Sequence, residues 1–145
     1  MIIPATEVHL PQIIAIEQEA FNLTWTHEMF SRELSRPDSY FDVAVENGAV
    51  IGFCILRRIA DVEGEILNIA VSQAFRRRGV ADALLNSAMT HAEGIAEVYL
   101  EVRVGNSAAI LLYEKHGFRQ LGRRKHYYDA PIEDAFTMCR VSRFT

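Results

Sequence analysis

The dipeptide Asn47–Gly48 divides the run YFDVAVENGAVIGFCILRR, residues 40–58, into two segments rich in β-branched and aromatic residues. A two-residue hairpin turn of type I′ needs positive φ angles at both of its positions, and Asn followed by Gly supplies them at little steric cost. The composition of the flanking segments favours strands. We therefore predict an antiparallel β-hairpin at this point, and this hairpin is the strongest local constraint on the fold.

The rest of the chain contains no internal repeat, low-complexity tract or Gly/Ser-rich linker, so we treat residues 1–145 as a single domain. The further predicted elements are strands over 2–5, 65–71, 97–104, 118–128 and 134–143, and helices over 7–21, 26–34 and 79–91. A further helix is predicted in SAAILLYEKHGF, residues 107–118, with Gly117 as its C′ residue. One strand–helix–strand unit supplies a parallel crossover, whereas the hairpins are antiparallel. We predict an α/β fold with a mixed, mostly antiparallel sheet of about seven strands and helices on its faces.

Composition excludes several classes of protein. Half of the residues are hydrophobic and 23% are charged, which is typical of a soluble globular protein. No run approaches 18 apolar residues, and the N-terminal segment lacks a basic region before an apolar one, so we expect no membrane span or secretory signal. Cys54 and Cys139 lie in apolar, strand-like runs without a CxxC or CxxH pair, so we expect reduced thiols, no metal and a cytoplasmic location.

The charge distribution is uneven. A formal net charge of −4 and a pI near 5.7 argue against a general nucleic-acid-binding protein. Two local clusters, Arg76–Arg78 and Arg123–His126, have the opposite sign. A local basic cluster on an acidic protein suits a small phosphorylated ligand better than a polynucleotide.

The first cluster lies between an apolar strand and the start of a predicted helix. A helix N-terminus presents unpaired N–H groups and the positive end of the helix dipole, so cations are unfavourable there unless an anion lies beside them. The pattern Arg76-x-x-Gly79-x-Ala81 is neither a Walker loop nor the dinucleotide fingerprint. By itself it is also compatible with a solvated helix start, but three consecutive arginines favour a bound phosphate.

With this loop as a starting point, the chain resembles the GNAT family of N-acetyltransferases over essentially its whole length. The signature of that family, Q/R-x-x-G-x-G/A after the fourth strand, is matched by Arg76, Gly79 and Ala81. The chain is similar, more narrowly, to the ribosomal-protein-alanine N-acetyltransferases. The segments that carry this similarity are NIAV at 68–71, LEVRVGNSAAILLYEKHGF at 100–118, YY at 127–128 and EDAFTM at 133–138.

The resemblance implies a GNAT fold and acetyl-CoA as co-substrate, with no metal. The strand before the loop would pair with the pantetheine arm, and the loop amides would hold the pyrophosphate. The coenzyme-binding residues implied in this way are Ile69, Ala70, Val71, Arg76, Arg77, Arg78, Gly79, Val80, Ala81, Asp82 and Asn106. Asn106 is also a good helix N-cap, a role that is compatible with contact to the coenzyme.

Two residues are candidates for proton transfer. Glu101 lies on the polar face of the predicted strand 97–104, where it is either one half of a solvated pair with Arg103 or, as the resemblance implies, the general base. Tyr113 lies on nearly the same helix face as Asn106 and is either a core tyrosine or, by the resemblance, the general acid that protonates the leaving thiolate. Neither cysteine has a motif for an acyl-enzyme, so we expect direct transfer in a ternary complex.

The acceptor side carries a weaker signal. Trp25 and either Tyr127 or Tyr128 could wall a peptide slot, or could equally belong to the core. The resemblance implies a protein N-terminus as acceptor, typically the alanine of a small-subunit ribosomal protein, and neither nucleic acid nor membrane as partner. An acetyltransferase for small amines and a non-catalytic acyl-CoA-binding domain remain as alternatives, and the oligomeric state is open.

Overall fold

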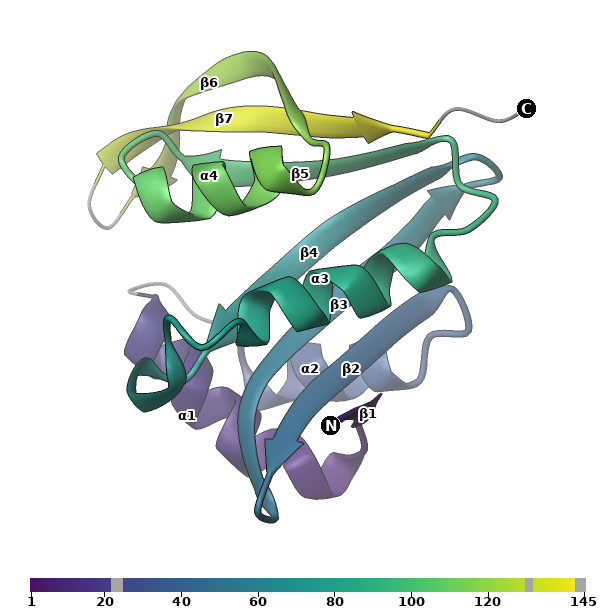
Figure 1. Cartoon of the computed structure of the whole chain (residues 1–145), viewed down its shortest axis with the longest axis vertical. Helices are drawn as coiled ribbons and strands as arrows, with labels where there is room; N and C mark the ends of the chain where they lie inside the picture. The colour runs from purple at the N-terminus through teal and green to yellow at the C-terminus, as the bar shows by residue number, and fades with distance from the viewer. Residues whose placement is uncertain (22–24, 130–131, 143–145) are drawn as a thin grey trace. The chain divides into compact units, whose positions relative to one another are not determined.

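The computed structural model describes residues 1–21, 25–129 and 132–142, with the elements shown in Figure 1. The strands are β1 (Ile2–Pro4), β2 (Ser39–Glu46), β3 (Ala49–Ala60), β4 (Glu63–Val71), β5 (Glu97–Arg103), β6 (Arg119–Asp129) and β7 (Ile132–Val141). The helices are α1 (Leu10–Ala20), α2 (His27–Leu34), α3 (Val80–His91) and α4 (Ser107–Lys115), with 3₁₀ turns η1 (Glu7–His9) and η2 (Gln73–Phe75).

The strands are hydrogen-bonded in the order β1-β2-β3-β4-β5-β7-β6. Strands β4 and β5 run parallel, and the pairs β1–β2, β2–β3, β5–β7 and β6–β7 are antiparallel. The predicted mixed, mostly antiparallel sheet of seven strands is therefore confirmed. In the described part of the chain, no helix is long and apolar enough to cross a membrane.

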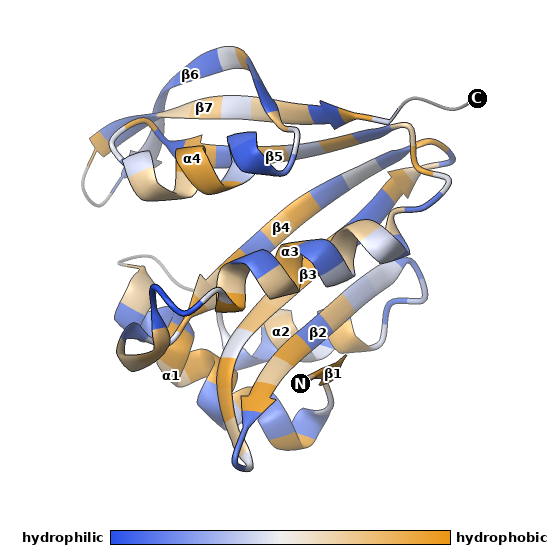
Figure 2. Ribbon diagram, in the orientation of Figure 1, coloured by the Kyte–Doolittle hydropathy of each residue, from blue (hydrophilic) through white to orange (hydrophobic). Residues whose placement is uncertain are grey.

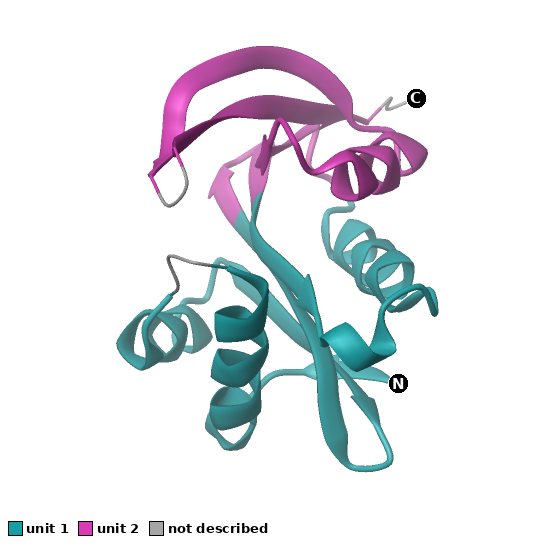
Figure 3. Ribbon diagram, turned by 90° about the vertical axis from the view of Figure 1, so that its left-hand side faces the viewer, with its two compact units in different colours: residues 1–57, 66–93 teal, residues 58–65, 94–145 magenta. Residues whose placement is uncertain are grey.

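Contacts divide the chain into two compact units (Figure 3). The first unit comprises residues 1–57 and 66–93, and the second comprises residues 58–65 and 94–145. Strands β3 and β4 each contribute residues to both units. That residues 1–145 act as one N-acetyltransferase domain stays a prediction.

The first unit is built on the predicted hairpin. Asn47 and Gly48 have φ angles of 51° and 79°, the positive values that a type I′ turn requires, so the predicted turn is confirmed. Helices α1 and α2 cover one face of this part of the sheet and α3 covers the other (Figures 1 and 3). Strand β3 is accordingly apolar and buried over residues 50–56, and Figure 2 shows the apolar residues along it.

Aromatic side chains fill the core of the first unit on the side of α1 and α2. Phe30 of α2 is fully buried, and its ring lies 5.9 Å from Phe41 and 5.6 Å from Phe53 between centroids. Leu10 and Ile13 of α1 complete this cluster. Burial of each such side chain contributes about 1.5–3 kcal/mol relative to leaving it exposed.

The first helix begins later than predicted. Residues Glu7–His9 form a 3₁₀ turn after the N-cap Thr6, and α1 starts at Leu10. The reason is Pro11, which has no N–H to donate to the carbonyl of Glu7, so α-helical hydrogen bonding cannot include that carbonyl. The N–H of Leu10 donates to it in the 3₁₀ manner instead.

The second unit contains β5, α4, β6 and β7. Along β5 the even-numbered side chains are buried and the odd-numbered ones half-buried, which is the predicted alternation. Helix α4 ends in a Schellman motif, in which the N–H of Phe118 donates to Tyr113 and that of Gly117 to Glu114. Gly117 has a φ of 92°, so the predicted C′ role of this glycine is confirmed.

Other predicted boundaries differ from the structure by a few residues. Strand β4 begins at Glu63, two residues before the predicted start, because the turn after β3 is shorter than the segment DVEGE. Strand β7 begins at Ile132, also two residues early. The predicted end of β7 at residue 143 lies outside the described residues.

Candidate functional site

The predicted pyrophosphate loop lies in the first unit, between the end of β4 and the start of α3. Gly79 is the N-cap of α3, and the first hydrogen bond of the helix runs from the N–H of Ala83 to the carbonyl of Gly79, at 3.0 Å. The N–H groups of Val80, Ala81 and Asp82 therefore precede the first helical hydrogen bond. They are the groups that an anion at this helix end would contact.

The backbone of the loop has a feature that residue types did not predict. Arg77, like Gly79, has a left-handed backbone, with φ values of 64° and 79° respectively. A left-handed arginine costs energy that a glycine does not. Two left-handed residues so close together turn the chain at the helix start.

The three arginines of the loop differ in their contacts, and all three are exposed. The Nε of Arg76 donates to the carbonyl of Val71 at 3.2 Å, which holds the loop against the end of β4. Arg78 pairs with Glu46 at 3.1 Å, and its guanidinium lies 5.0 Å from the centre of the Phe75 ring. Arg77 is the arginine of this loop whose charge is most available to a ligand.

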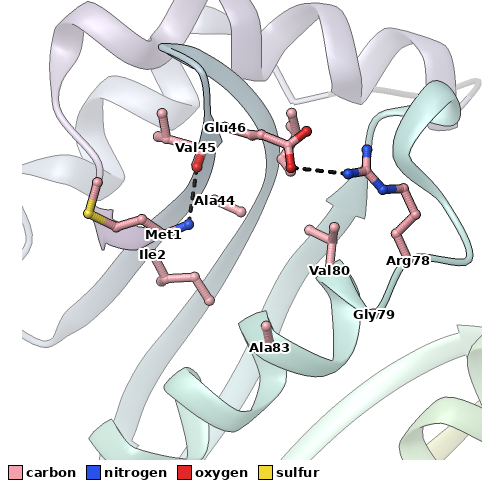
Figure 4. A pocket seen from close by; sticks show the side chains of 10 residues that line it. Met1, Ile2, Ala44, Val45, Glu46, Arg78, Gly79, Val80 and Ala83 are labelled. Carbon is pink, nitrogen blue, oxygen red and sulfur yellow. Dashed lines mark hydrogen bonds and ion pairs between the residues drawn. The ribbon is translucent and has the colours of Figure 1, made fainter.

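A cavity of about 220 Å³ lies beside the Gly79 turn, within the first unit. Figure 4 shows the Arg78–Glu46 ion pair at one side of it and Val80 of α3 facing it. The remaining lining comes from Met1, β1, β2, β3 and α3. The cavity therefore lies at the same end of α3 as the loop.

Gly52 of β3 sets the distance between the sheet and α3. A Cβ atom at this position would lie 3.0 Å from the carbonyl oxygen of Ala70, 3.1 Å from Leu84 and 3.3 Å from Val80. A larger residue here would therefore require the Ala70 carbonyl and the Leu84 and Val80 side chains to shift by a few tenths of an ångström. Gly52 is not among the predicted site residues, although a glycine inside a strand is a known signal of close backbone approach.

Glu101 lies on β5 in the second unit, and its side chain is 14% exposed. The hydroxyl of Thr137 donates to Oε2 of Glu101 at 2.7 Å, from the directly opposite position on β7. The Nε of Arg124 on β6 lies 3.4 Å from Oε1. Both carboxylate oxygens thus have a partner on a neighbouring strand, and these partners hold the carboxylate in one orientation.

The other two candidates of the second unit lie on α4. Asn106 caps the helix as predicted, because its Oδ1 accepts a hydrogen bond from the N–H of Ala109 at 3.2 Å. Tyr113 is 7% exposed, and its ring packs edge-on against Phe118 at 5.9 Å. The ring therefore belongs to the core, as one of the two interpretations expected, and the role of the hydroxyl stays a prediction.

Glu133 joins the β5–α4 connection to β7. Its carboxylate accepts hydrogen bonds from the N–H of Gly105 at 2.7 Å and from Arg103 at 3.2 Å. The guanidinium of Arg103 lies 4.2 Å from the centre of the Tyr128 ring, a cation–π contact. Tyr127 packs edge-on against Tyr128 at 4.9 Å.

The second basic cluster is largely neutralised within its own unit. Arg123 pairs with Asp134 at 2.7 Å, and Arg124 faces Glu101. The interpretation of residues 123–126 as a site for a phosphorylated ligand is therefore weakened, because two of its charges already have acidic partners. Lys125 and His126 are exposed on the irregular part of β6 between Arg124 and Tyr128.

Trp25 lies in the first unit, directly before Thr26, which caps α2 through a hydrogen bond to the N–H of Met29 at 3.2 Å. The Trp25 ring packs on Phe30 at 5.2 Å, which is the hydrophobic staple of a helix N-terminus. The ring is half-buried, so its exposed part is available to a ligand. Its predicted place in an acceptor slot stays a prediction.

The cysteines are poor candidates for covalent catalysis. Cys54 and Cys139 are both buried and free, and burial raises the pKa of each thiol. A thiol held in its neutral form is a weak nucleophile. Within the described ranges, no group of three or more His, Cys, Asp or Glu side chains is arranged to hold a metal ion.

Comparison with known proteins identifies the family. Residues 10–118 match the model of the acetyltransferase (GNAT) family. The chain belongs to this family. The matched region includes the loop with Arg76 and Gly79 as well as Glu101 and Tyr113.

Three similar proteins extend this result. The N-alpha-acetyltransferase RimI of Mycobacterium tuberculosis is 36% identical over 121 residues, which cover 81% of this chain and 76% of that protein. The crystal structure of the ribosomal-protein-S18-alanine N-acetyltransferase from Escherichia coli has a TM-score of 0.90 and 31% identity, over 100% of this chain and 95% of that one. The NatC complex bound to Gag peptide and CoA matches with a TM-score of 0.84 and 25% identity, over 99% of this chain and 98% of that one.

The resemblance to ribosomal-protein-alanine N-acetyltransferases and the GNAT fold are thereby confirmed. The prediction that this chain is an enzyme, an acetyl-CoA-dependent protein N-terminal acetyltransferase, is also confirmed. The comparisons do not test the individual site residues, which stay predictions.

Proposed function

We propose that this acetyltransferase transfers the acetyl group of acetyl-CoA to the α-amino group of a protein N-terminus, most specifically the N-terminal alanine of a small-subunit ribosomal protein. Similarity to the M. tuberculosis and E. coli enzymes supports the class of acceptor. The observation that carries the proposal is the Glu101 carboxylate, which is held from both sides by Thr137 and Arg124. The proposed acceptor is made in the cytoplasm, where we expect the enzyme to act.

The residues of the first unit fit acetyl-CoA. The start of α3, with the positive end of the helix dipole, and the exposed charge of Arg77 suit a pyrophosphate. Ile69, Ala70 and Val71, at the end of β4, would accept the pantetheine arm through their backbone, and Asn106 of the second unit would contribute a further polar contact. Acetyl-CoA supplies the thioester whose acetyl carbon forms the new bond to the amine.

In the proposed mechanism, residues of the second unit move the protons. Glu101 accepts a proton from the acceptor ammonium, directly or through a water, so that the amine lone pair can attack. The C–N bond forms and the C–S bond breaks without an acyl-enzyme, which agrees with the neutral, buried thiols of Cys54 and Cys139. The hydroxyl of Tyr113 donates its proton to the departing thiolate, and the phenolate recovers a proton from the nitrogen, which still carries one proton too many after the attack. A phenol is protonated at neutral pH and so can act in this way.

A screen of acceptors tests the proposal. Peptides varied at their first three residues, each with a free or blocked α-amino group, would be compared with a panel of small amines at equal concentration. We expect kcat/KM to be highest for free N-terminal alanine peptides and to vanish for blocked ones. Higher kcat/KM for a small amine would overturn the peptide acceptor, and acetyl-CoA binding without transfer to any acceptor would indicate a non-catalytic domain.

A further inference from the structure

The proposed mechanism gives no role to Glu17, the least exposed carboxylate among the described residues. Glu17 of α1 is only 1% exposed, because it lies on the buried face of the helix together with apolar core residues. A carboxylate out of contact with water is costly unless hydrogen bonds satisfy its oxygens. Burial raises the pKa of Glu17, and hydrogen bonds from Trp25 and Asn68 oppose this increase. A group retained at such a cost requires a structural or functional reason.

The two oxygens of Glu17 join three separate segments of the first unit. Oε1 accepts a hydrogen bond from the side-chain amide of Asn68 on β4, at 2.8 Å. Oε2 accepts one from the backbone N–H of Trp25, also at 2.8 Å. Asn68 is itself buried at 9% exposure and directly precedes Ile69, the first of the residues predicted to pair with pantetheine.

The two partners do not depend on Glu17 to the same extent. Asn68 lies within the nine-residue strand β4, whose position in the sheet is set by its neighbouring strands. Trp25 lies outside any helix or strand, directly before the N-cap of α2, so its N–H has no acceptor from regular structure. Loss of the Glu17 carboxylate would therefore free the backbone of Trp25 and leave β4 in place.

We propose that Glu17 is a positioning residue that sets the Trp25 backbone, and with it the half-exposed indole ring, relative to the β4 segment that precedes Ile69–Val71. This inference rests on the proposed function, because Trp25 is predicted to contact the acceptor peptide. Glu17 touches no reacting atom and acts through Trp25. Its effect is on acceptor affinity and not on the chemical step.

The test variant, Glu17→Met, removes the two carboxylate oxygens that accept hydrogen bonds and keeps the length of the side chain. In Glu17→Met the KM for an alanine peptide should increase by about tenfold, because the Trp25 N–H and the Asn68 amide both lose their acceptor and Trp25 is no longer held in place. The kcat at saturating peptide and the dissociation constant of acetyl-CoA should stay within about threefold of wild type. Trp25 is the single tryptophan of the chain, so its emission spectrum reports this site and should shift to longer wavelength.

Two further variants separate positioning from general destabilisation. Gln12→Met is the matched control, because Gln12 on the same helix accepts a hydrogen bond from the backbone N–H of Val50 at 2.8 Å, away from Trp25. It should leave both KM and the emission spectrum unchanged. Glu17→Gln should restore most of the affinity, because its amide oxygen can accept from Trp25 while its NH₂ donates to a rotated Asn68 amide.

The outcomes distinguish this inference from the proposed function. An unchanged peptide KM and emission spectrum in Glu17→Met would overturn the positioning role and leave the acetyltransferase function intact. A wild-type enzyme inactive on every peptide would instead overturn the function. If Glu17→Met does not fold, Glu17→Leu serves in its place, because it removes the same two acceptor atoms and fills the buried site with an apolar group; an unchanged KM there would likewise contradict the proposal.

Discussion

At the scale of single residues, the candidate base is defined by neighbours that are remote in sequence. Thr137 is 36 residues from Glu101, and Arg124 lies on another strand. Both contacts orient a carboxylate that would otherwise rotate freely on a half-buried strand face. A side chain held in one orientation is what a general base needs, because proton transfer requires hydrogen-bond distance to the substrate.

Glu101→Gln is expected to lower kcat by about 10²–10⁴, because the amide is nearly isosteric but cannot accept the proton. The dissociation constant of acetyl-CoA, measured by calorimetry, should stay close to the wild-type value. Glu97→Gln is the matched control, since Glu97 lies on the same face of β5 and contacts Tyr99 at 2.6 Å. Equal turnover in wild type and Glu101→Gln would show that Glu101 is an ordinary strand residue.

Tyr113→Phe separates the proposed acid from a packing role. The ring is buried against Phe118 and remains in the variant, so folding and acetyl-CoA binding should be retained. If the hydroxyl protonates the thiolate, kcat should fall, and the defect should shrink with an acyl donor whose thiol is more acidic. The measurement is kcat for both enzymes with both donors. A defect of the same size with each donor would argue against proton donation by Tyr113.

At the scale of elements, the β4–loop–α3 segment combines several requirements in a short stretch. The left-handed turn at Gly79 aims the helix start, and Gly52 allows α3 to pack closely on β3. The Arg76 contact to Val71 ties the loop to the end of the strand. The segment therefore depends more on backbone geometry than on the charges of its side chains.

Gly79→Val should weaken acetyl-CoA binding more than Arg77→Ala does. A Cβ atom at Gly79 would meet nothing within 4 Å, so the effect comes from the φ of 79° and not from a clash. A β-branched residue in the left-handed conformation costs at least about 1–2 kcal/mol. If the loop of the variant relaxes when free and must return to this conformation to bind acetyl-CoA, the cost increases Kd by roughly tenfold. Calorimetric titration of both variants measures this. A larger loss in Arg77→Ala would mean that the guanidinium, and not the loop amides, holds the pyrophosphate.

At the scale of the whole molecule, the acidic chain places an exposed arginine at the start of a helix. On β6, Arg123 faces Asp134 and Arg124 faces Glu101, whereas Arg77 in the first unit is exposed before the start of α3. A net charge of −4 with such a local exception suits a small anionic ligand. Binding of that ligand should be visible in the stability of the protein.

Acetyl-CoA at 100 times its Kd should stabilise the folded protein by about 2.7 kcal/mol. For a chain of this size, that corresponds to an increase in Tm of roughly 5–10 °C in a thermal unfolding experiment. Acetyl-pantetheine, which lacks the pyrophosphate, is the control and should give a much smaller shift at equal concentration. Equal shifts for the two compounds would remove the loop from the binding site.

The residue pattern was sufficient for those features that depend on neighbours in sequence. The turn at Asn47–Gly48, the cap at Asn106 and the end of α4 at Gly117 were all predicted, because each follows from the conformational range of one or two residues. The alternation along β5 was predicted for the same reason. Boundaries were less accurate where two local effects compete, as at Pro11 and the start of α1.

Only the tertiary structure decided which of these side chains have partners and which are buried. The strand order places β7 beside β5, and this register brings Thr137 opposite Glu101. Packing of α1 on the sheet likewise buries Glu17 against Asn68, which is 51 residues away. No local sequence pattern predicts these contacts. The partners are far apart in sequence and meet only because the order and connections of the strands bring them together.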